Sequence, residues 1–239
     1  MRFQHQNILV IGGSSGIGLD LIRLLNNEGA TIYAASRNRS AEWPAAVHYL
    51  EMDVMQGPES LSAFIPDELH GLVYCVGNIN LKPFNRISAL DLIDDFRLNV
   101  VGAALSIQQA LKSLKNVSSA SIVLMSSVAA RTGMGFHSSI ASSKAAVEGL
   151  TISLAAELSP NHIRVNAVAP SLTHTPLAGK LLNTPEKMEA SAKRHPIGRF
   201  GEPKDISAAI AYLLSSDSSW ITGQILTVDG GIGNLKTNF

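Results

Sequence analysis

A glycine-rich segment directly follows the first apolar run of the sequence. It reads Ile11-Gly12-Gly13-Ser14-Ser15-Gly16-Ile17-Gly18 and separates a predicted buried strand at 7–12 from a predicted helix at 16–27. Glycines here let the backbone approach a pyrophosphate closely, while the helix start offers unpaired N–H groups to the anion. Because the spacing is GxxxGxG and no Gly-Lys-Ser/Thr follows, the segment favours a dinucleotide over a nucleotide triphosphate. A tight strand-to-helix connection without a ligand is the alternative.

The end of the second predicted strand indicates the type of dinucleotide. It reads Ala35-Ser36-Arg37-Asn38-Arg39 and lacks the acidic residue that would bind an adenosine ribose. Arg37 can neutralise and stack on a phosphorylated adenosine, and Ser36 leaves space and a hydroxyl donor. These residues favour NADP(H) as the cofactor, with NAD(H) less favoured. A solvated basic loop would have the same composition.

Short β-branched runs alternate with longer stretches of helical periodicity, which predicts an α/β fold. Continuously apolar strands imply a parallel sheet covered by helices on both faces, here a Rossmann-type, doubly wound sheet of seven strands. Strands are predicted at 7–12, 31–35, 47–51, 71–76, 121–126, 163–168 and 224–228, and helices at 16–27, 59–66, 88–115, 138–159 and 204–215. Residues 1–239 are predicted to form a single domain, in which the proline-containing segment 171–203 forms a lid over a ligand site.

Composition excludes several functional classes. Nineteen basic residues balance nineteen acidic ones in 239 residues, which argues against a nucleic-acid binder and against an anionic membrane surface as partner. The lone thiol of Cys75 cannot form an internal disulfide, so we expect a reducing, cytoplasmic location. The seven histidines show no metal-ligand spacing. A small-molecule substrate is the remaining expectation.

Over essentially its whole length the sequence resembles the short-chain dehydrogenase/reductase family. Ile11 to Gly18 resembles the family's TGxxxGIG turn, with isoleucine in place of threonine. The other matching segments are Asp53-Val54, Gly77 of a degenerate NNAG motif, Asn99, Ser126-Ser127, Lys144, Asn166 to Ser171 (NAVAPG with Ser171 replacing glycine), Thr175, Arg199 to Pro203, Thr222 to Gln224 and Val228 to Gly231.

The resemblance implies a set of site residues. The catalytic positions are Asn99, Ser127 and Lys144, where Ser127 donates to the substrate oxygen, Lys144 holds the nicotinamide ribose and Asn99 supports a water chain to Lys144. The implied cofactor-binding residues are Gly12, Ser14, Ser15, Gly16, Ile17, Gly18, Ser36, Arg37, Asp53, Val54, Val76, Gly77, Asn99, Lys144, Pro170, Thr173 and Thr175.

The sequence departs from the family where a tyrosine should transfer the proton. That tyrosine stands four residues before the lysine and thirteen after the serine, and this position holds Ile140. No tyrosine occurs between Tyr74 and Tyr212, so a shifted motif does not restore it. The nearby substitute is His137, which lies on the same face as Ile140 if a helix begins near Phe136. Imidazole can donate or accept a proton near neutral pH. The alternative is that His137 is only a helix-entry residue lining the pocket.

Two functions follow from these residues. The first is an NADP(H)-dependent oxidoreductase that acts on an alcohol or carbonyl compound with altered proton transfer. The second is a non-catalytic NADP(H)-binding sensor or scaffold, favoured by the missing tyrosine. The resemblance further implies a homo-oligomer, a dimer or tetramer, paired through the helices near 99–115 and 138–159.

Overall fold

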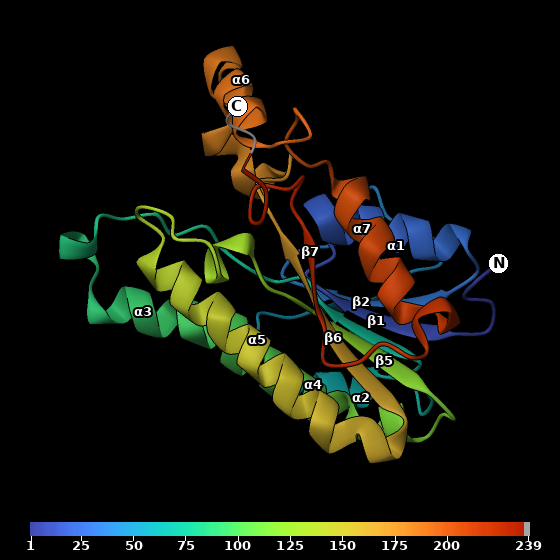
Figure 1. Ribbon diagram of the computed structural model, residues 1–239. Coiled ribbons are helices and arrows are strands. Elements are labelled where there is room, and N and C mark those ends of the chain that lie inside the picture. The colour runs from blue at the N-terminus through green and yellow to red at the C-terminus, as the bar shows by residue number, and fades with distance from the viewer. Residues whose placement is uncertain (237–239) are drawn as a thin grey trace.

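The computed structural model describes residues 1–236, which contain a seven-stranded parallel sheet (Figure 1). Its strand order is β3-β2-β1-β4-β5-β6-β7. The strands are β1 (Asn7–Ile11), β2 (Thr31–Ser36), β3 (His48–Glu51), β4 (Gly71–Tyr74), β5 (Ala120–Met125), β6 (Ile163–Pro170) and β7 (Ile225–Val228). The Rossmann-type α/β fold is thus confirmed, and all seven predicted strands are present with ends shifted by one or two residues.

Helices cover both faces of this sheet. They are α1 (Gly16–Asn27), α2 (Leu61–Phe64), α3 (Ala89–Phe96), α4 (Gly102–Lys115), α5 (Ser138–Leu158), α6 (Pro185–Arg194) and α7 (Pro203–Leu214). Figure 1 shows α1 and α7 on one face and α4 and α5 on the other. Successive side chains of a strand point to opposite faces. Leu9 and Ile11 therefore join the core under α4 and α5, while Ile8 and Val10 join the core under α1 and α7.

The helical stretch predicted over 88–115 is present from Ala89 to Lys115, but its hydrogen bonding is not α-helical throughout. A π-helical turn, Arg97–Val101, separates α3 from α4. The buried Tyr74 hydroxyl donates a hydrogen bond to the carbonyl of Leu98 at 2.6 Å, and it lies where a side chain at Gly102 would be. The Tyr74 hydroxyl therefore occupies space beside the helix at the point where its hydrogen bonding changes, and single π-turns within helices are frequent at functional sites. Asn99 lies within this turn.

The lid segment contains more regular structure than the sequence predicted. Residues Pro176–Leu181 form a 3₁₀ helix and α6 follows it, where no helix was expected. Thr184 caps α6 by accepting from the N–H of Lys187 at 3.3 Å, and Pro185 occupies the first turn. Figure 1 shows α6 beyond the ends of β6 and β7 and apart from α5. The helix predicted at 59–66 is shortened to α2.

The Tyr74 hydroxyl provides a test of what holds the π-turn. Replacing Tyr74 with Phe removes the donor to the Leu98 carbonyl, so we expect the free energy of unfolding to fall by about 1 kcal/mol. Urea denaturation measures this change. Tyr33→Phe is the matched control, because the Tyr33 ring packs on His48 and Phe64 while its hydroxyl donates to none of residues 1–236. Equal stability of both variants would contradict the assignment.

Candidate active site

Two adjoining cavities lie at the carboxyl edge of the sheet. One of about 590 Å³ follows the glycine-rich turn and the end of β2, and the other, of about 770 Å³, lies between the start of α5 and the lid. Residues that line both cavities mark their junction: Ile17, Cys75, Val76, Gly77, Asn78, Thr175 and Leu177. A ligand in one cavity can therefore reach the other.

The glycine-rich turn has the geometry of a phosphate cradle. Gly12 has a φ of +87°, and a Cβ there would lie 2.9 Å from Val76, while a Cβ on Gly18 would collide with the Gly12 carbonyl. The hydroxyl of Ser15 makes no cap hydrogen bond to α1, so the first N–H groups of that helix are open to a ligand. The Trp43 indole anchors the turn by donating to the Gly13 carbonyl at 2.8 Å.

The first cavity collects most of the residues expected to bind a cofactor. Its lining includes Gly12, Ser14, Ser15, Gly16, Ile17, Gly18, Ser36, Arg37, Asp53, Val54, Val76, Gly77 and Thr175. The exposed Arg37 side chain belongs to this lining whereas Arg39 does not. Asp53 is oriented by accepting from the Met55 N–H at 3.0 Å. These residues fit a phosphorylated dinucleotide, with cationic charge beside the end of β2.

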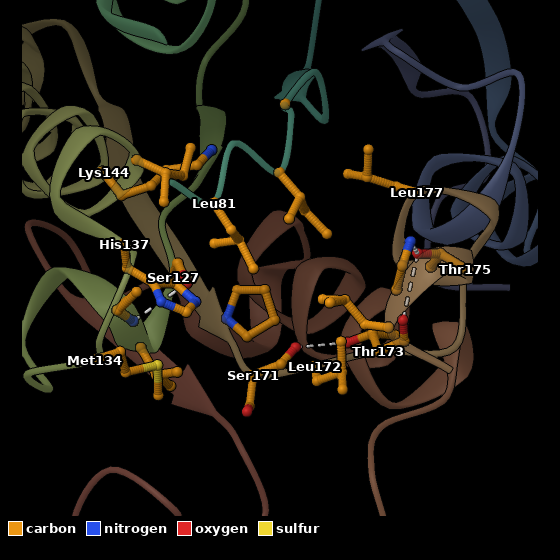
Figure 2. A pocket seen from close by; sticks show the side chains of 18 of the residues that line it. Leu81, Ser127, Met134, His137, Lys144, Ser171, Leu172, Thr173, Thr175 and Leu177 are labelled. Carbon is orange, nitrogen blue, oxygen red and sulfur yellow. Dashed lines mark hydrogen bonds between the residues drawn. The ribbon is translucent and has the colours of Figure 1, made fainter. Parts of the chain in front are cut away.

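The second cavity brings together Ser127, His137, Lys144, Pro170 and Thr173. Figure 2 shows Ser127, His137 and Lys144 on one side of it and residues 171–177 on the other. Ser127 begins a short 3₁₀ turn and its Oγ accepts from the Ala129 N–H at 3.2 Å. Since that bond occupies only a lone pair, the hydroxyl proton of Ser127 remains available to a substrate oxygen.

Lys144 is a buried cation at the back of the second cavity. Its Nζ donates to the Met125 carbonyl at 2.8 Å, and only 6% of the residue is exposed. Burial disfavours the ammonium form and lowers the pKa of Lys144 to about 8. The side chain is therefore largely charged at neutral pH and loses that charge just above it.

Asn99 lies behind both cavities and lines neither. Its Nδ2 donates to the Asp95 carbonyl at 2.8 Å and to Asn78 Oδ1 at 3.2 Å. Its buried Oδ1 has no hydrogen-bond partner within residues 1–236. The Oδ1 of Asn99 and the Nζ of Lys144 approach the same point, a Cβ position on Gly77, to 3.6 and 3.5 Å. The structure thus places Asn99 beside Lys144.

Ile140 and His137 line the same cavity, and the helix predicted at 138–159 is present with its start at Ser138. Helix α5 begins two residues after Phe136, with His137 as its N-cap residue. Phe136 has a φ of +67° and cannot be part of the helix. His137 Nδ1 lies 2.6 Å from the Gly135 carbonyl, which can only accept. Nδ1 therefore carries a proton, and Nε2 is the ring nitrogen left for a ligand.

Sequence reasoning missed a hydrogen-bonded pair that joins the lid to the sheet. Ser171 Oγ lies 2.9 Å from Nε2 of the buried His195, whose Nδ1 lies 2.7 Å from the Ser191 carbonyl. Because that carbonyl requires the proton on Nδ1, neutral His195 accepts from Ser171. Ser171 stands where the family has a glycine, and its hydroxyl therefore links the end of β6 to the end of α6. Twenty-four residues separate the partners, so no local pattern could show them.

Part of the wall of the second cavity is apolar and is formed by Met134, Leu172, Leu177 and Leu181. Cys75 lies at the junction, and desolvation raises the pKa of its thiol to about 12. In residues 1–236 no group of three or more His, Cys, Asp or Glu side chains could hold a metal ion. None of the helices in the same residues is both long and apolar enough to span a membrane.

Comparisons with known proteins agree with this architecture. Residues 12–233 match the model of a family described as enoyl-(acyl carrier protein) reductase. Carbonyl reductase family member 4 of Danio rerio is 35% identical over 238 residues, covering 94% of this chain and 96% of the relative. Cyclopentanol dehydrogenase of Comamonas testosteroni is 30% identical over 244 residues, covering 96% of this chain and 98% of the relative.

A solved structure shows the same fold over nearly the whole chain. Gluconate 5-dehydrogenase of Burkholderia cenocepacia, in complex with NADP and tartrate, superposes with a TM-score of 0.89 at 25% identity. The superposition covers 98% of each chain. The family match over residues 12–233 and this structural similarity together establish the family of the chain. It belongs to the short-chain dehydrogenase/reductase family of oxidoreductases.

Proposed function

We propose that the protein is an NADP(H)-dependent oxidoreductase that interconverts a carbonyl compound and its alcohol, with an altered route for the proton. One observation carries the proposal: Ser127, His137 and Lys144 converge on a cavity that adjoins the phosphate cradle. Relatives named as a carbonyl reductase and a cyclopentanol dehydrogenase support the reaction class. The gluconate dehydrogenase with bound NADP supports the cofactor.

In this proposal, different residues of the two cavities bind different parts of the cofactor. The glycine-rich turn and the N-terminus of α1 bind the pyrophosphate, Ser36 and Arg37 bind the ribose phosphate, and Asp53 and Val54 flank the adenine. Lys144 holds the nicotinamide ribose, while Val76, Gly77, Pro170, Thr173 and Thr175 surround the nicotinamide end. When bound, the nicotinamide supplies the hydride.

Ser127 and His137 supply the remaining chemistry of carbonyl reduction. The Ser127 hydroxyl donates to the carbonyl oxygen and stabilises the charge that develops on it. Protonated His137 donates from Nε2 to the same oxygen as it becomes an alkoxide, giving an alcohol and neutral imidazole. His137 is only half-buried, so it regains its proton from solvent. Oxidation of an alcohol runs the same steps in reverse, with neutral His137 as the base.

A non-catalytic cofactor-binding protein is the second candidate. Ile140 favours it, since 94% of this residue's surface is buried in an apolar wall that offers no proton at the position of the family's tyrosine. Both candidates require the phosphate cradle and Lys144. They differ only in whether NADPH is oxidised by a carbonyl compound.

We also propose that the chain forms a homo-oligomer through α4 and α5. Large apolar side chains are exposed on α3, the π-turn, α4 and α5: Leu90, Leu92, Ile93, Phe96, Val101, Leu105 and Ile152. Helices α3 and α5 pack together, so these side chains belong to neighbouring elements. An apolar surface of this kind is typical of protein–protein interfaces.

Cofactor choice is tested by replacing Arg37 with Ala. The variant loses a charged contact to the ribose phosphate, so the Kd for NADPH should rise roughly tenfold or more while the Kd for NADH stays nearly constant. Titration by nicotinamide fluorescence measures both constants. Arg39→Ala is the matched control, because Arg39 is equally cationic but lies outside the cavity lining. Parallel losses in both variants would point to a general charge effect.

The role of His137 is tested by His137→Gln, which keeps a hydrogen-bonding side chain but cannot transfer a proton. Turnover should fall by roughly tenfold or more, because a positioned acid is worth 10²–10⁴ in rate. NADPH oxidation with a panel of ketones and quinones gives the readout. His48→Gln, at the far edge strand of the sheet, should leave turnover unchanged. Unchanged turnover in His137→Gln would refute the assignment.

Ile140→Tyr separates the two candidate functions with the same assay. The substitution restores a phenol to the wall of the second cavity beside Lys144 and His137. If the native protein is a reductase that uses His137, activity is measurable before the change and becomes less dependent on His137 after it. If NADPH binds but only the tyrosine variant oxidises it, the native protein is a cofactor binder.

Lys144 makes cofactor binding dependent on pH. Its lowered pKa of about 8 means that the ammonium form is lost as the pH rises through about 8. The Kd for NADPH should therefore rise between about pH 7 and about pH 9. Fluorescence titration at a series of pH values measures the change. In Lys144→Met the affinity should be lower and nearly independent of pH; an unaltered profile would contradict this role.

A further inference from the structure

One face of α6 looks into the second cavity and carries two cations. Lys187, Ala190, Ser191 and Arg194 line the cavity at spacings of three, four and seven residues, which place them on one side of the helix. The small Ala190 and Ser191 occupy the middle of this face. Lys187 and Arg194 stand at its two ends.

The charges of α6 are divided between the face that lines the cavity, where Lys187 and Arg194 are also exposed to solvent, and the opposite face. Glu186, Glu189 and Lys193 lie outside the cavity lining, and Lys193 pairs with Glu189 at 2.6 Å. Acidic side chains are absent from the cavity lining that residues 1–236 provide. The cavity therefore has a positive potential on the side formed by α6.

Neither cation of the inner face has an acidic partner within residues 1–236. Lys187 Nζ donates to the Lys180 carbonyl at 3.2 Å and to Asn183 Oδ1 at 2.8 Å, which are neutral groups. Arg194 Nη2 donates to Ser191 Oγ at 3.0 Å. These bonds hold the two side chains on the cavity face and leave their positive charges uncompensated, in contrast to the paired Lys193.

The remainder of the cavity is largely apolar. Its other walls include Ile79, Leu81, Met134, Ile140, Leu172 and Leu177, and its volume of about 770 Å³ suits a small organic ligand. Figure 2 shows Leu81 and Leu177 extending toward the space between Ser127 and the 171–177 segment. The cavity thus has the reacting groups Ser127 and His137 on one wall and, within residues 1–236, two unpaired cations on the lid. This arrangement suits a ligand with an apolar body and an anionic end.

We propose that the substrate is a carbonyl compound with an apolar body and a carboxylate, which binds to Lys187 and Arg194 on the lid. This proposal rests on the proposed reductase function. The guanidinium of Arg194 matches the planar carboxylate and Lys187 adds a point charge. Binding the carboxylate to α6 also holds the lid over the cavity, since α6 follows the 171–177 segment and is tied to β6 through His195 and Ser171.

The test uses two ketones that differ only in charge, para-acetylbenzoate and its methyl ester. In the double variant Lys187→Met/Arg194→Met, kcat/KM for the acid should fall by about 10- to 100-fold, the value of charged hydrogen bonds, and kcat/KM for the ester should change less than about twofold. Methionine keeps the apolar length of both side chains. Lys193→Met removes one positive charge from the outer face of α6, where the double variant removes two from the inner face, and it should affect neither substrate.

Calorimetric titration of the acid into the protein separates this proposal from the reductase function. If neither ketone is reduced but the acid binds to the wild type and not to the double variant, the reductase proposal fails and the anionic subsite stands. If the ketones are reduced but acid and ester respond equally to the double substitution, the subsite is refuted and the reductase function stands. Failure of the acid to bind the wild-type protein would also refute the subsite.

Discussion

The site depends on parallel pairing of β1 with β2 on one side and β4 on the other. The chain winds outward from β1 through β2 to β3 and then returns to start β4, so the connections diverge between β1 and β4. A crevice opens at such a switch point, outside the carboxyl ends of the strands. The ladder continues past the strand ends, where Gly12 donates to the Ala35 carbonyl at 2.9 Å and Cys75 to the Ile11 carbonyl at 2.8 Å. These two hydrogen bonds fix the backbone at Gly12 and at Cys75, on the two sides of the crevice.

The sequence predicted those features that depend on neighbours along the chain. Apolar strand runs and the turn from Gly12 to Gly18 are local patterns, and the resemblance located Ser127 and Lys144. The π-turn at Asn99 could not be predicted, because it depends on the Tyr74 hydroxyl, which lies 24 residues before Leu98. Helix α6 was missed because its sequence is polar and proline-flanked, although its 187, 190, 191 and 194 spacing is helical. The Ser171–His195 bond likewise exists only in the folded chain.

Lys144 shows why cofactor binding and proton transfer are separable at this site. A buried ammonium is costly unless other groups compensate it. Here the Met125 carbonyl accepts from it and the charge of Asp95 favours the protonated form, so the side chain stays cationic at neutral pH without a tyrosine beside it. The isoleucine at 140 therefore removes a proton donor and leaves the electrostatics of the cofactor site in place.

The same substitution changes what the second cavity can recognise. A phenol at position 140 would put a polar group into the wall beside Ser127, whereas Ile140 extends the apolar surface that includes Leu81 and Met134. The basic side chains that could contact a ligand then lie at the margins, with His137 at the entry of α5, Lys144 at the back, and Lys187 and Arg194 on the lid. Because the apolar centre itself offers no hydrogen bond, a ligand must be oriented by Ser127 at its reacting oxygen and by these groups at the margins. Lys187 and Arg194 therefore contribute more to ligand orientation with Ile140 in the wall than they would with a tyrosine at that position.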